Sequence, residues 1–168
     1  HFVTGENPQR TGNDHPLVAP YGLYDTADGQ IAIAPSNDQV LQRLLTEIGL
    51  AELLEDPRFD SNAKRFERRD ELHAILDAAL ASDTQENWII RLNRAGVPTG
   101  KIQTLKDVFE DPQIKAQEMS IDVPHGDRGD VRMLGFPVKL SRTPCEVRLP
   151  APELGEHTEE VLSALRDG

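Results

Sequence analysis

The segment 69–81 carries the most regular apolar spacing in the chain and constrains the fold most strongly. Its apolar residues recur at positions i, i+3, i+4, i+7 and i+8, and they are Leu72, Ile75, Leu76, Ala79 and Leu80. This spacing places all of them on one face of an α-helix. The segment therefore predicts a helix with one buried face.

Further helices are predicted on both sides of this segment. The stretch 38–49 places its apolar residues on one stripe and ends at Gly49. Thr84 is expected to cap a helix that stops at Gly96. The order Asp56-Pro57 suits another helix start, because proline is favoured at the first helical position. Shorter helical pieces are predicted at 50–55, from Thr104 to about 110, from Asp111 to about 118, and at 157–166.

Two β-hairpins are predicted around this helical middle. Residues 19–26 and 30–34 are short apolar runs that flank the turn sequence Asp28-Gly29. The runs 119–124 and 130–135 flank a second turn rich in glycine. From residue 136 to 154 prolines recur every few residues, which predicts an extended exit from the domain. The predicted fold class is α+β.

Charge and cysteine content exclude several classes of protein. The chain has 29 acidic and 18 basic residues, and the net charge of −11 argues against binding to a nucleic-acid backbone or an anionic membrane. No apolar run approaches the roughly 18 residues of a membrane-spanning helix. The single cysteine, Cys145, cannot form an internal disulfide, so a cytoplasmic location is expected. The chain begins with His1 and not with methionine, which suggests a longer parent polypeptide or a removed tag.

Eight short stretches resemble, in the same order, the C-terminal half of the class III (CaiB/BaiF) CoA-transferases. This family includes formyl-CoA transferases, carnitine CoA-transferases and α-methylacyl-CoA racemases. The stretches are Arg10 to Pro16, Ala19 to Tyr21 with Thr26 to Gly29, Ser36 to Asp38, Asp56 to Phe59 with Asn62 and Arg65, Ala95 to Gly100, Phe109 to Gln113, Leu140 to Pro144, and Leu154 to Thr158.

The resemblance implies that the chain is the C-terminal portion of a protein more than twice as long. Residues 1–19 would be a linker with an active-site loop. Residues 20–135 would be a small α+β domain that covers the active-site cleft, and 136–168 an extended return segment with a short C-terminal helix. A large Rossmann-like domain upstream of residue 1 would bind CoA and supply the nucleophilic aspartate. No catalytic residue is therefore expected in this chain, and the parent is expected to be an interlocked homodimer.

The implied activity is transfer of CoA between an acyl-CoA and a carboxylic acid. A carboxylate attacks the thioester to form a mixed anhydride, and the released CoA thiolate attacks back to form an aspartyl thioester, which passes CoA to the acceptor acid. A CoA thioester would thus be a substrate, and no tightly bound cofactor is expected.

Two alternatives to this function stay open. One is an α-methylacyl-CoA racemase on the same scaffold, which would use His and Asp to move a proton. The other is a stand-alone acidic interaction module, which predicts no exposed apolar surface at 136–168.

The first group of candidate substrate-binding residues is Gly12, Asn13, Asp14 and His15. They match the position of the family's glycine-rich active-site loop, whose backbone N–H groups can approach a reacting oxygen. Only Gly12 is a glycine here, which weakens an assignment to formyl- or oxalyl-specific members. The alternative interpretation is a simple turn that enters a strand.

The second group is Asn37 and Asp38, which lie where racemase-type members place an acidic residue near the cleft. The alternative is a helix N-cap ahead of residues 38–49, and both roles can hold together. Lys64, Arg65, Arg68 and Arg69 form a basic cluster for which a solvated helix face is favoured over a CoA-phosphate contact.

The remaining histidines carry no clear signal of chemistry. His73 is expected at the boundary of the core, and His125 in a hairpin turn. The histidines of the chain lack a ligand spacing such as H-x-x-x-H, so no metal site is expected.

Overall fold

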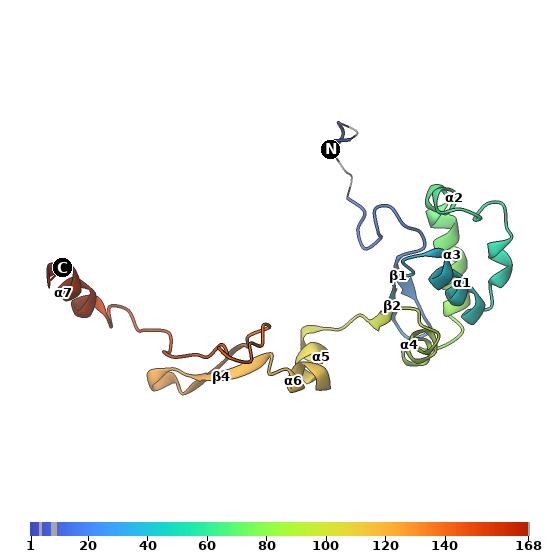
Figure 1. Ribbon diagram of the computed structural model, residues 1–168. Coiled ribbons are helices and arrows are strands. Elements are labelled where there is room, and N and C mark those ends of the chain that lie inside the picture. Colours follow the sequence, from blue (N-terminus) through green and yellow to red (C-terminus); the bar gives the residue numbers. More distant parts are fainter. Residues whose placement is uncertain (4, 8–9, 168) are drawn as a thin grey trace. The chain divides into compact units, whose positions relative to one another are not determined.

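The computed structural model describes residues 1–3, 5–7 and 10–167, and the chain divides into two compact units, 1–102 and 103–168 (Figure 1). In the described part of the expected linker, 1–19, there is no helix or strand, while its positions 4, 8 and 9 lie outside the described residues. The expected small domain, 20–135, extends over the first unit and part of the second. Its boundaries stay a prediction.

The first unit contains a three-stranded antiparallel sheet. Strand β1 (Gly22–Asp25) pairs with β2 (Gln30–Ile33), and β2 pairs with β3 (Thr99–Lys101). The turn between β1 and β2 closes where the Thr26 N–H donates to the Gly29 carbonyl at 2.7 Å. The first predicted hairpin is therefore confirmed.

Helical segments are present in the first unit where they are predicted at 38–49, at 50–55, at 69–81 and after Thr84. The helix predicted at 38–49 ends two residues earlier, at Glu47. Ile48 is its C-cap, and Gly49 follows with a φ of +79°, a left-handed conformation that terminates helices. The Thr84 hydroxyl accepts a hydrogen bond from the Asn87 N–H and caps its helix as expected. The elements are α1 (Asp38–Glu47), the 3₁₀ turn η1 (Ala51–Leu54), α2 (Asn62–Glu67), α3 (Arg69–Leu80) and α4 (Gln85–Arg94).

The predicted helix start at Asp56-Pro57 is wrong, because α2 begins only at Asn62. Asp56 closes a single turn, in which its carbonyl accepts from the Phe59 N–H at 2.9 Å. The carbonyls that a continuing helix would need are used by side chains: Lys64 Nζ binds the Pro57 carbonyl at 3.0 Å, and Arg65 binds the Phe59 carbonyl at 3.1 Å. These bonds leave the segment as a turn that inserts Phe59 into the core.

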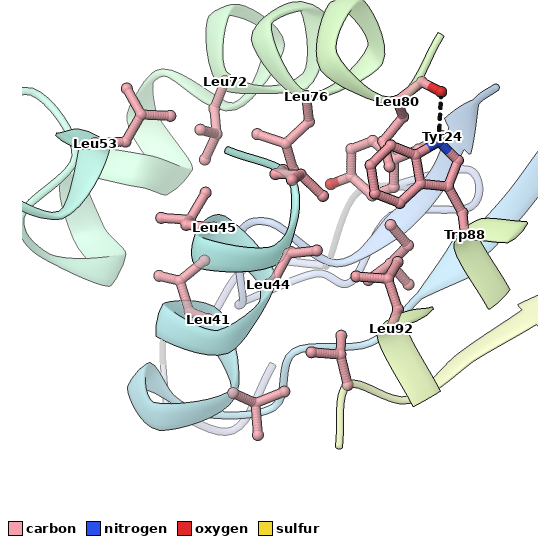
Figure 2. Close-up of a cluster of buried hydrophobic side chains, with 14 of the residues drawn as sticks. Tyr24, Leu41, Leu44, Leu45, Leu53, Leu72, Leu76, Leu80, Trp88 and Leu92 are labelled. Carbon is pink, nitrogen blue, oxygen red and sulfur yellow. Dashed lines mark hydrogen bonds between the residues drawn. The ribbon is translucent and has the colours of Figure 1, made fainter. Parts of the chain in front are cut away.

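The core of the first unit lies between one face of the sheet and helices α1, α3 and α4. Figure 2 shows Leu72, Leu76 and Leu80 along α3, directed toward leucines of α1 and α4. The residues in this buried cluster are Tyr24, Ile31, Ile33, Val40, Leu41, Leu44, Leu45, Ile48, Leu53, Phe59, Leu72, Leu76, Leu80, Trp88, Leu92 and Val97. The apolar spacing of 69–81 thus corresponds to the central buried face.

Trp88 joins α3 to α4 within this core. Its indole Nε1 donates to the Leu80 carbonyl at 2.7 Å, drawn as the dashed line in Figure 2. The chain has one tryptophan, and this side chain is 2% exposed. Its fluorescence therefore reports on the folding of the first unit.

The second unit contains two short helices, a hairpin and a C-terminal helix. Thr104 forms a capping box with Asp107 at the start of helix α5 (Leu105–Glu110). Asp111 caps helix α6 (Pro112–Ala116) through the N–H groups of Gln113 and Ile114. The Gln103 amide, together with these two N–H groups, holds the pKa of the Asp111 carboxyl below its usual range. The elements are α5 (Leu105–Glu110), α6 (Pro112–Ala116), β4 (Ser120–Pro124), η2 (Gly126–Arg128), β5 (Asp130–Leu134) and α7 (Thr158–Asp167).

Both the second hairpin and the extended exit follow the prediction. Strands β4 and β5 are antiparallel, and no helix or strand occurs between β5 and α7. The α+β fold class is confirmed. In the described part of the chain, no helix is both long and apolar enough to cross a membrane.

Candidate functional site

The candidate site is a cavity of about 220 Å³ at the N-terminal end of α1. Asn37 and Asp38, two of the six predicted site residues, line this cavity. The other lining residues are Val18, Ala19, Pro20, Pro35, Ser36, Leu41, Asn62 and Arg65. A second cavity of about 200 Å³ shares Asp38, Leu41 and Arg65 with the first, and leucines of α1 and η1 together with Phe59 supply most of its remaining wall.

Arg65 of α2 is a buried cation at this cavity, with only 7% of its surface exposed. Its Nε donates to the Ala19 carbonyl at 2.9 Å, Nη1 to the Phe59 carbonyl at 3.1 Å, and Nη2 to Asp38 Oδ1 at 2.8 Å. A buried guanidinium is tolerated only when it is hydrogen-bonded, and here every nitrogen has a partner. The expectation of a solvated basic face is therefore wrong for Arg65.

Asn62, one turn earlier on α2, binds the same segment of the chain. Its Nδ2 donates to the Leu17 carbonyl at 2.8 Å, and its Oδ1 accepts from the Ala19 N–H at 3.1 Å. Together with the bond from Arg65 to the Ala19 carbonyl, these contacts fix the main chain of residues 17–19. We call the pair Asn62 and Arg65 the α2 latch. It places the segment that joins the loop 12–15 to β1.

Asn37 and Asp38 begin helix α1. Asn37 Oδ1 accepts from the Val40 N–H at 3.0 Å, so the N-cap interpretation is confirmed. Asp38 lies in the first turn, where a carboxylate interacts favourably with the helix dipole. Its side chain is 87% exposed although one oxygen pairs with Arg65. Both residues therefore have structural partners, and a contact to substrate stays a prediction.

Replacing Asn37 with alanine should lower the free energy of unfolding by about 1 kcal/mol, because the Val40 N–H loses its acceptor. Asn37→Ser should restore most of the stability, because serine also caps helices. Urea unfolding followed by Trp88 fluorescence would measure the difference. Ser36→Ala is the matched control, since Ser36 is exposed and makes no hydrogen bond with the described residues. Equal stability of Asn37→Ala and Ser36→Ala would contradict the capping role.

The loop 12–15 forms a turn that leads toward β1. The Thr11 hydroxyl donates to the Asp14 carbonyl at 2.8 Å, and Gly12 has a φ of +64°, which favours glycine. The His15 N–H donates to the Tyr21 carbonyl at 3.0 Å, beside the first residue of β1. The turn interpretation is confirmed, and the role of the loop at an active site stays a prediction.

Asp14 is the charged residue of this loop, and it packs closely on β1. A Cβ at Gly22 would meet the Asp14 carboxylate, so a larger residue there would force this side chain to shift. Asp14 Oδ2 lies 3.5 Å from Arg69 Nε, a buried nitrogen that has no hydrogen-bond partner among the described residues. Burial raises the pKa of the neighbouring Tyr24 hydroxyl well above its usual range, and the Asp14 carboxylate adds to this effect. Tyr24 is therefore a neutral core residue.

His73 ties α3 to β1. Its ring stacks on Tyr24 at 4.6 Å, Nε2 lies 2.8 Å from the Leu23 carbonyl, and Nδ1 lies 3.0 Å from Asp77 Oδ2. The other carboxylate oxygen of Asp77 accepts from the Asp25 N–H at 2.8 Å. The side chain of His73 is about one-third exposed, which agrees with a place at the boundary of the core.

The arrangement of the candidate site residues is better suited to binding a ligand than to covalent catalysis. Asp14 and Asp38 each lie beside an arginine, so neither carboxylate is an isolated nucleophile. The described residues contain no group of histidine, cysteine, aspartate or glutamate that could hold a metal ion. The two predicted groups of site residues, 12–15 and 37–38, contact different arginines, Arg69 and Arg65. Residues 17–19 follow the first group in the chain and are bound by Arg65, which contacts the second group. Arg65 and Asn62 were missed as site residues because the bonds that hold residues 17–19 go to backbone atoms more than 40 residues away.

The comparisons with known proteins agree on one family. The family model described as CoA-transferase family III matches residues 1–158. The chain is 30% identical to the succinate–glutarate CoA-transferase of Agrobacterium fabrum over 98% of its length, and 35% identical to the succinyl-CoA–D-citramalate CoA-transferase of Chloroflexus aurantiacus over 97%. It spans 41% of each of these relatives.

A solved structure shares the same fold. The crystal structure of a CAIB/BAIF family protein from Brucella suis matches 98% of this chain with a TM-score of 0.75 and 35% identity, and the chain spans 42% of that protein. Nearly the whole of this chain thus matches these proteins, but it spans only about two fifths of their length.

Proposed function

The chain belongs to CoA-transferase family III, and from this premise we propose that it forms part of an enzyme that transfers CoA between an acyl-CoA and a carboxylic acid. The match of the family model over nearly the whole chain is the observation that carries this proposal. The CoA thioester is a substrate in this proposal and not a tightly bound cofactor.

Within this enzyme, we propose that the chain is the C-terminal portion and covers the active-site cleft. Residues 20–135 form the small domain, and 136–168 return to a larger domain that supplies the nucleophilic aspartate. The ion pairs of Asp14 and Asp38 support the assignment of the nucleophile to another part of the protein. Gly12 to His15, Asn37 and Asp38 face the substrate in this arrangement, and two copies of the whole protein interlock in the cytoplasm.

The acceptor is a dicarboxylic acid. This choice is supported by the names of relatives, which refer to glutarate, D-citramalate and oxalate. All three compounds carry two carboxyl groups. A second carboxylate gives the enzyme a charged group to bind at a distance from the reacting one, and such remote contacts help to position the reacting oxygen.

The exposed apolar residues of the second unit argue against a stand-alone interaction module. That alternative predicts no exposed apolar surface at 136–168. Leu149, Leu154 and Leu165 are instead 75%, 105% and 74% exposed. Apolar surface of this kind is typical of a segment that packs on another part of a protein.

The test is an assay of CoA transfer by this chain alone and by the whole protein that contains it. Succinyl-CoA is supplied as donor with glutarate as acceptor, and glutaryl-CoA is separated by chromatography. We expect glutaryl-CoA from the whole protein and none from residues 1–168. Transfer by the chain alone would contradict the assignment of the nucleophile to another part of the protein.

Two further incubations distinguish the alternatives. Butyrate in place of glutarate should yield little butyryl-CoA if a dicarboxylic acid is required. A 2-methylacyl-CoA in deuterium oxide should take up no deuterium at the α-carbon. Deuterium uptake without CoA transfer would instead identify the racemase.

A further inference from the structure

His15 has one ring nitrogen that is committed to the loop itself. Nδ1 lies 3.1 Å from the backbone nitrogen of Leu17 and 3.1 Å from that of Val18. Both groups are backbone N–H donors, so Nδ1 must present its lone pair and carries no proton. Pro16, between His15 and these donors, has no N–H of its own. The imidazole therefore closes the turn as an acceptor.

The other ring nitrogen then carries the N–H of the neutral imidazole. Nε2 has no hydrogen-bond partner among the residues that the structure describes, and it is not among the buried unpartnered atoms there. The ring is partly exposed and packs against Tyr21, with the ring centroids 4.9 Å apart. The Nε2–H donor is thus available to a ligand and is fixed in direction by the contacts of Nδ1 and of the ring.

We propose that His15 donates a hydrogen bond from Nε2 to a carbonyl or carboxylate oxygen of the bound substrate, and that it does not act as a base. This inference rests on the proposed CoA transfer. An oxygen gains negative charge as an acyl carbon is attacked, and a donor that is already oriented stabilises this charge without reorganisation. The unprotonated nitrogen that a base would need is occupied by the N–H groups of Leu17 and Val18.

The surroundings of His15 suit an oxygen ligand. The nearest carboxylate along the chain, Asp14, lies 3.5 Å from Arg69 Nε, so its charge is balanced locally. The His15 N–H is already bonded to the Tyr21 carbonyl, which fixes the backbone beneath the ring. A racemase would require a histidine with a free basic nitrogen, and His15 does not offer one in this structure.

The tautomer can be tested on the 168-residue chain without any assay of activity. Long-range proton–nitrogen NMR spectra of a ¹⁵N-histidine sample distinguish a protonated from an unprotonated ring nitrogen, and the His15→Asn variant identifies the His15 signals by their loss. We expect protonated Nε2 and unprotonated Nδ1. A proton on Nδ1 would overturn the inference.

The donor role is tested with two variants that each keep one half of the imidazole. Asparagine places an acceptor where Nδ1 lies, and glutamine places an N–H near Nε2. In the whole protein, His15→Asn should lower kcat/KM for succinyl-CoA and glutarate by about 100-fold, as expected for loss of a donor to a developing charge. The Leu17 and Val18 amides should keep their protection from hydrogen exchange. His15→Gln should retain more activity than His15→Asn, while these two amides exchange faster.

Two results would overturn the donor role. One is His15→Asn with kcat/KM equal to that of the wild type. The other is His15→Gln with Leu17 and Val18 amides as protected as in the wild type, because Nδ1 would then not be the group that closes the turn. If the wild-type whole protein transfers no CoA, the proposed function fails, and the NMR spectra still decide the tautomer.

Discussion

Replacing Arg65 with methionine is expected to lower the free energy of unfolding of the first unit by about 2–6 kcal/mol. The guanidinium binds the carbonyls of Ala19 and Phe59, and both of these residues are 2% exposed. Methionine fills a similar volume but leaves both carbonyls buried without a donor, and each such group costs about 1–3 kcal/mol. Arg65→Lys should fall between, because one ammonium group cannot reach all of the guanidinium's partners.

Arg68→Met is the matched control. Arg68 follows directly after α2, its side chain is 43% exposed, and its ion pair with Glu67 spans 3.7 Å. Exposed pairs of this kind contribute about 0–1 kcal/mol, so the control should unfold close to the wild type. Urea unfolding monitored by Trp88 fluorescence measures all three variants. If Arg65→Met were as stable as Arg68→Met, the burial of Arg65 would be refuted.

Replacing Leu76 with alanine is expected to cost about 2–5 kcal/mol of stability, because it leaves a cavity in the centre of the core. Leu76 is 0% exposed and lies between Leu72 and Leu80 on α3 (Figure 2). The same fluorescence measurement would report a lower urea midpoint.

Ile90→Ala serves as the comparison for Leu76→Ala. Ile90 lies on α4 with 49% of its surface exposed, so a truncation there opens no enclosed cavity. A surface truncation of this type changes stability by about 0.5 kcal/mol. Similar losses for the two variants would mean that α3 does not form the centre of the core.

Local patterns in the sequence are sufficient to predict most of the elements of this fold. The spacing of Leu72, Leu76 and Leu80 identifies the buried face of α3, because a helix repeats every 3.6 residues whatever covers it. The turn at Asp28-Gly29 and the caps at Thr84 and Thr104 depend on neighbours within four residues. Such features are visible without knowledge of the tertiary structure.

The two errors share a physical cause. Asp56-Pro57 has the sequence of a helix start, yet Lys64 and Arg65 bind the carbonyls that the helix would have used. Arg65 lies in a run of basic residues that suggests a solvated face, yet its partners include the Ala19 carbonyl, 46 residues away. A backbone carbonyl has no side-chain identity, so no residue pattern indicates which arginine will bind it.

The candidate site shows the same division between local and distant contacts. The cap by Asn37 is readable from its position before an apolar run, and the structure confirms it. The tautomer of His15 follows from two N–H groups within three residues, but only the folded turn shows that both meet one nitrogen. The contact of Asp14 with Arg69 joins residues that are separated by most of the first unit.

The α2 latch has a consequence for how sequences of this kind can diverge. All of the bonds from Asn62 and Arg65 to residues 17 and 19 go to main-chain atoms, across separations of 43 to 46 residues. Every amino acid offers the same carbonyl, and every one except proline the same N–H, so these bonds do not depend on which side chains residues 17 and 19 carry. Leu17 is 72% exposed, so its side chain can change while α2 keeps the segment in place, whereas the buried Ala19 has no room for a larger side chain. The position of the segment next to the loop 12–15 is therefore determined by two side chains of α2, Asn62 and Arg65, which lie outside that loop.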